Sequence, residues 1–232
     1  MKQKTGRKLI GFLLTLAMVV GLVPGMSLTA YADTYVASIG DDKYTTFEAA
    51  FTSAKSGQTI KLLADADVTG KDTYWITVPN LTVDLNGFGI YKTAHYSSAE
   101  SIFGAYGNNH HSGSVHLTIK DSNPSNTDNS SGHRPAGVTG GYIIGPERIG
   151  VFVVPGGTFT MEGGTITANA ENSIAAVYVV DGGTFIMNGG TISNNNSIYG
   201  GVYINKTGTF IMNGGTITNN TASRNGGGIY SA

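Results

Sequence analysis

The 232-residue sequence contains no cysteine and few charged residues, which make up 12% of the chain. Without cysteine the fold cannot be held by disulfides, so stacked side chains and a continuous interior must stabilise it. The chain also lacks a basic surplus, because its formal net charge is −1. This excludes the electrostatic footprint of a nucleic-acid-binding protein. Glycine, by contrast, is abundant at 34 residues, which fits a turn-rich repeat fold better than a compact α/β enzyme.

The first 32 residues have the pattern of a secretory signal peptide. A basic head precedes an apolar run from Leu9 to Val23, and Ala30-Tyr31-Ala32 forms a small-x-small cleavage site. Cleavage after Ala32 predicts a secreted or cell-surface protein. The formal charge then falls from −1 to −5, because the leader carries four basic and no acidic residues. An uncleaved membrane anchor is the alternative, but the run is short for one. No later stretch is apolar enough, so no membrane span is expected in the mature chain.

A fourteen-residue pattern is written three times in the second half of the chain. The copies are GGTFTMEGGTITAN, GGTFIMNGGTISNN and TGTFIMNGGTITNN, and their phenylalanines, Phe159, Phe185 and Phe210, lie 26 and 25 residues apart. A fixed period of this size predicts a solenoid in which each copy is one supersecondary unit. Within a copy, apolar residues alternate with threonine between Gly-Gly pairs, which predicts short strands separated by tight turns.

A third strand is predicted in every period. The segments GVFVV, AVYVV, GVYIN and GIYSA place Phe152, Tyr178, Tyr203 and Tyr230 in one column. The sequence therefore predicts an all-β parallel β-helix with three strands per coil and about 25–26 residues per coil.

Polar residues are predicted to stack at the corners of the coils. Asn169, Asn195 and Asn220 each follow the isoleucine of their copy by three residues. Asparagine tolerates the left-handed conformation, so these residues are expected at tight corners, with their side chains hydrogen-bonded along a ladder. The paired glycines supply the other corner.

These repeats, together with LTVDLNG from Leu81 to Gly87 and LTIKDSN from Leu117 to Asn123, resemble a known group. They are similar to the right-handed parallel β-helix (pectin-lyase-like) domains of secreted and surface proteins of Gram-positive gut-type bacteria. The resemblance covers most of the chain after residue 33 and implies the fold. It does not select an activity, because this architecture hosts lyases, hydrolases and non-catalytic adhesin-like proteins.

Residues 33–58 are predicted to form an N-terminal cap made of a strand pair and a short helix, which would cover the open end of the first coil. Thr45 and Glu48 have the spacing of a capping box at the start of this helix. The segment from Thr59 to Val68 is predicted as the first coil strand.

Residues 59–232 are predicted to form the β-helix as one elongated domain. Its longest interruption, from Asp121 to Gly137, is expected to be a polar, flexible surface loop. The sequence ends at Ala232 inside a strand, without a polar cap. This predicts a truncated piece of a longer protein; the alternative is an open end that docks a second chain, giving end-to-end self-association.

Carboxylates are the first candidates for chemistry. The resemblance implies lyases with clustered aspartates, calcium and a basic residue, and hydrolases with several close aspartates. Here the coil carboxylates are scattered, and the catalytic candidates are Asp84, Asp121, Glu147 and Arg148. Asp84 and Asp121 close two outward strand faces and can lie near each other. The alternative for both is hydrogen bonding in a turn at the end of a strand.

Two further charged residues bear on whether the chain has a catalytic site. Arg134 lies with the catalytic candidates in the irregular region 84–150, which is the only place to build a walled cleft. Glu162 is replaced by Asn188 and Asn213 in the sister copies. It is therefore expected at a turn position where any polar residue serves.

All five histidines lie between His95 and His133, and His110, His111 and His116 are the candidates for a metal site. Their spacing matches no closed zinc pattern and no cysteine assists, so solvated loop histidines are the favoured interpretation. No metal and no cofactor are expected.

The column of Phe152, Tyr178, Tyr203 and Tyr230 is the candidate ligand-binding surface. If the flanking valines face inward, the rings face outward, where they can stack on sugar rings or meet a partner. The alternative is that the rings only strengthen the sheet. The sequence therefore predicts a non-catalytic exported β-helix, adhesin-like or for surface display, that contacts a polysaccharide or a cell-surface glycan. A polysaccharide lyase or glycoside hydrolase of the pectin-lyase-like fold is the alternative.

Overall fold

Strands account for nearly all the regular structure of the chain. The computed structural model describes residues 34–93, 101–105, 114–145, 149–167 and 173–232. The predicted leader lies outside these ranges. Among the described residues, one short helix accompanies a long series of strands, which confirms the predicted all-β class. No helix in the same ranges is both long and apolar enough to span a membrane.

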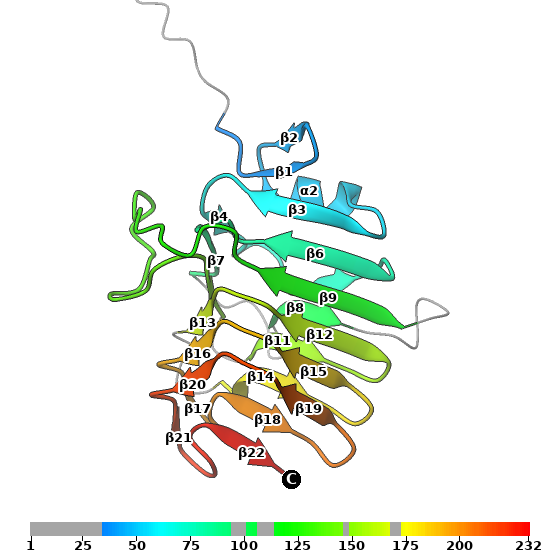
Figure 1. Ribbon diagram of the computed structural model, residues 1–232, viewed down its shortest axis with the longest axis vertical. Helices are drawn as coiled ribbons and strands as arrows, with labels where there is room; N and C mark the ends of the chain where they lie inside the picture. The colour runs from blue at the N-terminus through cyan, green and yellow to red at the C-terminus, as the bar shows by residue number, and fades with distance from the viewer. Residues whose placement is uncertain (1–33, 94–100, 106–113, 146–148, 168–172) are drawn as a thin grey trace, which may run out of the picture. The chain divides into compact units, whose positions relative to one another are not determined.

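The strands form three long sheets and one short sheet, shown in Figure 1. The first sheet contains, in spatial order, β19 (Thr209–Met212), β15 (Thr184–Met187), β12 (Gly157–Met161), β9 (Val115–Lys120), β6 (Asn80–Asp84), β3 (Gln58–Leu62), β1 (Ala37–Ile39) and β2 (Asp42–Tyr44). The second sheet contains β20 (Thr216–Thr218), β16 (Thr191–Ser193), β13 (Thr165–Thr167), β10 (Tyr142–Ile144), β7 (Gly89–Tyr91) and β4 (Ala66–Asp67). The third sheet contains β22 (Ile229–Ser231), β18 (Val202–Ile204), β14 (Ala175–Val179), β11 (Ile149–Val153), β8 (Ser101–Ala105) and β5 (Tyr74–Ile76).

Successive strands enter the first, second and third sheets in turn, starting at β3. In the last two rounds a short strand, β17 (Asn196–Ser197) or β21 (Thr221–Ala222), intervenes, and these two strands pair with each other. All pairings in the three long sheets are parallel except those that β1 makes with β2 and β3. Long parallel sheets visited in rotation are consistent with a β-helix.

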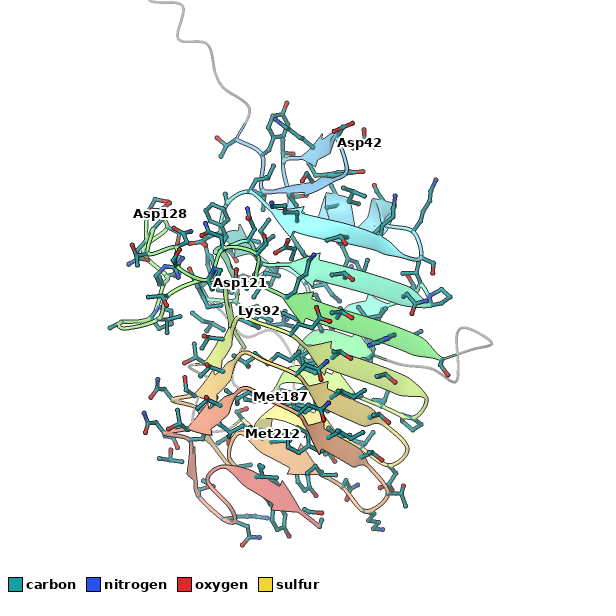
Figure 2. The ribbon with its side chains drawn as sticks, viewed as in Figure 1. Asp42, Lys92, Asp121, Asp128, Met187 and Met212 are labelled. Atoms are coloured by element: carbon teal, nitrogen blue, oxygen red, sulfur yellow. The ribbon has the colours of Figure 1, made fainter. Side chains whose placement is uncertain are left out.

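The repeated residues stack in register inside the sheets. Phe159 pairs with Phe185, which pairs with Phe210, and the ring centroids are 4.9 Å apart in both contacts. Phe159 and Phe185 are fully buried. Met187 and Met212 occupy the next inward position on neighbouring strands, as Figure 2 shows. Alternation along each strand thus sends one side chain to the interior and the next outward.

The three connections that follow β12, β15 and β19 have three residues each, with a Gly-Gly pair in every one. The second glycine of the pair takes a left-handed conformation, with φ of 80° at Gly190 and 86° at Gly215. The first approaches the preceding coil closely, because a Cβ on Gly189 would lie 2.5 Å from the carbonyl oxygen of Glu162. Each glycine is therefore required for a different reason.

The connections from the second to the third sheet vary more in length. Four residues separate β10 from β11, and ten separate β20 from β22. The difference between the 26- and 25-residue periods arises in this connection, because Tyr178 follows Ile166 by 12 residues whereas Tyr203 follows Ile192 by 11. The stacked columns of side chains therefore stay in register whatever the length of the connection from the second to the third sheet.

The asparagine prediction needs a correction. Asn194 and Asn219 have positive φ values, 55° and 52°, whereas the ladder residues Asn195 and Asn220 do not. The ladder residues instead turn their amides inward, and Asn195 Nδ2 donates to Asn220 Oδ1 at 2.8 Å. The corner and the ladder thus use neighbouring asparagines. Asn169 lies outside the described residues.

The helix α2 (Phe47–Ser53) begins one residue later than the predicted capping box requires. Thr46 is extended, and its Oγ1 accepts a hydrogen bond from Ala49 N at 3.1 Å, so it caps the helix. The predicted capping box between Thr45 and Glu48 is therefore wrong.

Aromatic contacts join α2 to the sheets. The ring of Phe47 meets Tyr74 edge-on at 5.1 Å and Phe103 at 6.0 Å. Phe51 contacts Tyr74 at 4.9 Å. The helix therefore packs on the interior that β5 and β8 line.

The segment from Thr59 to Val68, predicted as one strand, is divided between β3 and β4. Asp65 lies in the turn between them, and its Oδ1 accepts from Gly89 N at 2.6 Å. At this turn the chain passes from the first sheet to the second. The apolar run of the sequence continues through the turn and gives no sign of it.

Candidate functional site

An aromatic row runs along the outward face of the third sheet. Phe152, Tyr178, Tyr203 and Tyr230 occupy equivalent positions on β11, β14, β18 and β22. Each side chain is half-buried, while the valines on either side of Phe152 and Tyr178 are fully buried. The structure therefore brings together the four residues that the sequence placed in one column.

The tyrosines of this row stack face to face. The ring centroids of Tyr178 and Tyr203 are 4.7 Å apart and their planes differ by 14°. Tyr199, from the connection before β18, stacks on Tyr203 at 4.4 Å and on Tyr230 at 5.2 Å. Neighbouring rings therefore cover one another's faces and leave mainly ring edges and phenol groups toward solvent.

The stacking also affects the ionisation of the phenols. Burial raises the pKa of Tyr178, and the nearby phenol of Tyr203 raises it further. Burial likewise raises the pKa of Tyr203, followed by the effect of Tyr199. Tyr178 and Tyr203 therefore remain neutral at physiological pH.

Trp75 extends the row at its other end. It lies in register with Gly104, and Gly104 lies in register with Phe152. A Cβ on Gly104 would approach the indole to 2.3 Å, so the indole lies directly against the backbone of β8. Phe152 meets it edge-on at 6.3 Å, and 42% of the residue is exposed. Trp75 was not among the predicted residues, although its inward neighbours Tyr74 and Ile76 are the signal that places it on the outward face.

A cavity of about 290 Å³ adjoins the indole. Its lining combines aromatic, hydroxyl and charged side chains: Glu48, Phe51, Thr52, Lys71, Thr73, Tyr74, Trp75 and Thr77. Lys71 Nζ and Glu48 Oε1 form an exposed ion pair at 3.1 Å. We call this the Trp75 pocket.

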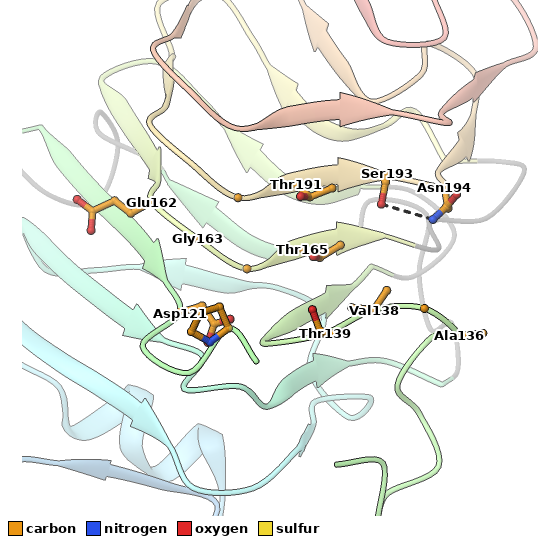
Figure 3. Close-up of a pocket in the computed structure, with 14 residues that line it drawn as sticks. Asp121, Ala136, Val138, Thr139, Glu162, Gly163, Thr165, Thr191, Ser193 and Asn194 are labelled. Atoms are coloured by element: carbon orange, nitrogen blue, oxygen red, sulfur yellow. Dashed lines mark hydrogen bonds between the residues drawn. The ribbon is translucent and has the colours of Figure 1, made fainter. Parts of the chain in front are cut away.

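A second, more polar cleft of about 520 Å³ lies where the first sheet turns into the second (Figure 3). Residues 136–139 form one side, and the Gly-Gly corners with the hydroxyls of Thr165, Thr191 and Ser193 form the other. Asp121 and Glu162 are its two carboxylates. In Figure 3 the Glu162 side chain points away from the two threonines.

Asp121 accepts three backbone hydrogen bonds. Its Oδ1 accepts from Gly87 N at 2.7 Å and from Asn123 N at 3.2 Å. Its Oδ2 accepts from Gly141 N at 2.7 Å. These contacts tie the turn after β6 and both ends of the 121–141 loop to one carboxylate, so the residue has a structural reason to be an aspartate.

Asp84 has a similar environment at the end of β6. The residue is 4% exposed, and its Oδ1 accepts from Asn86 N and from Ser122 N, both at 3.0 Å. Lys120 Nζ lies 3.9 Å from its other oxygen. Asp84 and Asp121 therefore both bridge the turns after β6 and β9, which is the alternative that the sequence left open for them.

Arg134 organises the loop that was predicted to be flexible. The residue is 8% exposed, and its guanidinium donates to the carbonyl oxygens of Asp128, Gly140 and Gly87, with Nη2 2.6 Å from the last. It also lies over the ring of Tyr142 at 4.9 Å. Asp121 stands at the base of this loop and Asp128 farther out (Figure 2). The loop is thus held by a buried cation.

Asp65 fastens the same loop from the other side. Its Oδ2 accepts from the hydroxyls of Ser131 and Tyr142, the second at 2.8 Å. Burial raises the pKa of Tyr142, and this hydrogen bond raises it further. Asp65 was not among the predicted residues, because nothing in the sequence links it to positions more than sixty residues away.

The remaining candidates do not assemble into a site in the described part of the chain. Glu147, Arg148, His110 and His111 lie outside it. His116 lies on the outward face of β9, where Nε2 is 2.7 Å from Thr160 Oγ1. No cluster of three metal-ligating side chains occurs among the described residues.

No family model matches the chain, and no curated protein or solved structure matches it either. Two outward features of the described residues are the candidate sites: the aromatic row with its Trp75 pocket, and the polar cleft.

Proposed function

We propose that this chain is an exported, non-catalytic β-helix that displays a glycan-contacting surface on its third sheet. Export is supported by the predicted leader over residues 1–32. A helix with three strands per coil is supported by the rotation of successive strands among three parallel sheets, and its right hand is what the resemblance to pectin-lyase-like domains implies. The cap over residues 33–58 is supported by α2 and the antiparallel strands β1 and β2.

The observation that carries the glycan contact is the aromatic row from Phe152 to Tyr230, which Trp75 extends beyond Gly104. The ring edges that the row leaves toward solvent offer apolar area with little conformational freedom to lose, and the phenol groups beside them can hydrogen-bond to sugar hydroxyls. The parallel strands repeat at about 4.8 Å, so the row forms a line suited to an extended chain. An extended polysaccharide matches this line better than a small metabolite, which requires an enclosed pocket.

The contacts of the cleft carboxylates favour binding over catalysis. Glycoside hydrolysis needs one carboxyl to deliver a proton and a second to activate water or attack. Asp121 already accepts three backbone hydrogen bonds. Glu162 stands where Asn188 and Asn213 stand in the next two coils. The polar cleft therefore supplies no described pair of carboxylates free for that chemistry.

A retention assay combined with a product assay tests the proposal. The full chain, expressed with its leader in a Gram-positive host, is collected from the medium and exposed to insoluble neutral and acidic polysaccharides. We expect a mature N-terminus at Asp33, retention on at least one polysaccharide, and no new reducing ends or unsaturated products. Product formation that Asp121→Asn abolishes would replace the proposal with the enzyme. Retention on none of the polysaccharides would remove the glycan contact.

End-to-end self-association stays a prediction. Ile211, Met212 and Ile229, on β19 and β22, are 43%, 45% and 44% exposed. Light scattering on the exported chain distinguishes a monomer from a dimer, and this result is independent of the retention assay.

A further inference from the structure

We propose that the polar cleft is a binding site for an uncharged saccharide, with the hydroxyl groups of Thr165 and Thr191 as its floor and residues 136–139 as its wall. This inference rests on the proposed function for the class of its ligand, a glycan. It places a second contact on the second sheet, separate from the aromatic row of the third.

The floor of the cleft is a column of hydroxyl groups. Thr165 on β13 is in register with Thr191 on β16, and each precedes a fully buried isoleucine, so both threonines lie on the outward face. Both line the cleft (Figure 3), and neither hydroxyl forms a hydrogen bond with another described residue. Because a hydroxyl can donate one hydrogen bond and accept two, the floor presents unused hydrogen-bonding capacity along the stack of coils.

The wall of the cleft is fastened to the rest of the fold. Arg134 and Asp121 hydrogen-bond to the backbone of residues 140–141, directly after the wall segment 136–139. Thr139 is exposed on this segment and lines the same cleft as the two floor threonines (Figure 3). A wall that is already held lowers the entropic cost of binding, because the ligand does not have to order the loop.

The charges of the cleft select the ligand class. None of the described residues that line it is basic or aromatic. Asp121 already accepts backbone N–H groups with both oxygens, and the Glu162 side chain points away from the floor threonines (Figure 3). A carboxylate or phosphate would therefore find no cation to pair with, whereas sugar hydroxyls match groups that both donate and accept. These contacts fit an uncharged saccharide.

An extended peptide is a poorer match for the same cleft. Such peptides bind to sheets by pairing with a free strand edge. The floor has no free edge, because β13 pairs with β10 and β16, and β16 pairs in turn with β20. The ligand must therefore be recognised through side-chain hydroxyls.

Isothermal titration calorimetry on the full exported chain tests the site. The neutral probes are cellopentaose, xylopentaose, mannopentaose and maltopentaose, and the acidic probe is pentagalacturonate. We expect at least one neutral pentasaccharide to bind, and pentagalacturonate to bind at least about tenfold more weakly. Binding of none of the neutral probes would overturn the inference.

Variants then assign the contact. Thr165→Val and Thr191→Val each remove a hydroxyl and keep a β-branched side chain of similar shape. Each should weaken binding of the neutral probe at least about threefold, and the double variant at least about tenfold. Thr216→Val is the matched control, because Thr216 is in register with Thr191 on β20 but does not line the cleft, and binding should be unchanged. Circular dichroism and thermal melting verify that each variant is folded.

The outcomes separate this inference from the proposed function. Binding of a neutral probe that the folded double variant leaves unchanged would overturn the cleft and leave the proposed function standing. Tighter binding of a cationic chitosan pentamer, lost in Glu162→Gln, would overturn the uncharged ligand class. If the chain is retained on no insoluble polysaccharide but binds a neutral probe that the double variant loses, the contact on the third sheet fails and the cleft stands.

Discussion

Residues 149–232 and residues 58–145 contribute strands to the same three sheets, but their turns are filled differently. In the later region the turns carry glycine and asparagine at repeated positions. Asn213 Nδ2 donates to Asn188 Oδ1 at 2.9 Å, as Asn195 does to Asn220. Neighbouring repeats are therefore joined by the same residue type, and these contacts follow the period of the sequence.

In the earlier region, three carboxylates and one arginine form the hydrogen bonds that hold the turns. Asp65, Asp84 and Asp121 accept backbone N–H groups from turns that are distant in sequence, and Arg134 donates to three carbonyl oxygens. Asp84, Asp121 and Arg134 all join the turn after β6 to the segment after β9, and none of these contacts repeats with a fixed period. Repeated asparagine ladders and individual cross-links are thus two ways to hold turns together, and we expect them to fail differently when broken.

The largest expected effect comes from breaking the repeated interior. Phe185→Asp places a charge between two stacked rings at a fully buried position. We expect the free energy of unfolding to fall by more than about 4 kcal/mol, with loss of the strand signal in circular dichroism. Phe210→Asp is the matched control in the same column, where the ring is only partly buried. Equal effects at the two positions would contradict the stacked interior.

An intermediate and local effect is expected from Arg134→Met. Removing the guanidinium leaves three carbonyl oxygens without their donor, and we expect a loss of about 3 kcal/mol. Hydrogen exchange should accelerate in residues 121–141 while the strands after β11 keep their protection. Arg224→Met, at an exposed arginine, should have little effect on either measurement. Faster exchange throughout the later strands would show that the two regions are not independent.

The smallest effect concerns the tyrosine row at alkaline pH. The pKa values of Tyr178 and Tyr203 are raised above the ordinary 10.0, so the folded state favours the neutral phenols. This contribution to stability is complete below pH 10 and is lost as the pH rises through the raised values. Urea unfolding at a series of pH values should therefore show stability falling above pH 10, less steeply in Tyr178→Phe. An identical slope in that variant would mean that Tyr178 ionises normally.

Much of the later region could be predicted from the sequence, because identical residues at a fixed spacing must stack in register. The phenylalanine column, the outward aromatic column and the turn position of Glu162 follow from that spacing. The asparagine corner was placed one residue too late, because the period gives the repeat of a residue without its backbone conformation. Asn194 and Asn195 are chemically identical, and only the fold distinguishes the corner from the ladder.

The earlier region could be predicted far less well, because its contacts have no period. Trp75 belongs to the aromatic row, but Gly104 stands between it and Phe152, so the spacing of aromatic residues is interrupted. Arg134 lies in a segment whose composition is that of a flexible loop, and its burial depends on carbonyl groups that no residue type reveals. The Trp75 pocket depends on α2 and β5 meeting, which requires the tertiary structure.

The variable connections from the second to the third sheet have a consequence for how such a chain can change. Residues can be gained or lost there without shifting the stacked columns, as the 25- and 26-residue periods already illustrate. The three-residue Gly-Gly turns offer no such freedom. This one corner is therefore where lineages of the protein can diverge in length, and where a peptide epitope can be inserted with the least disturbance to the stack.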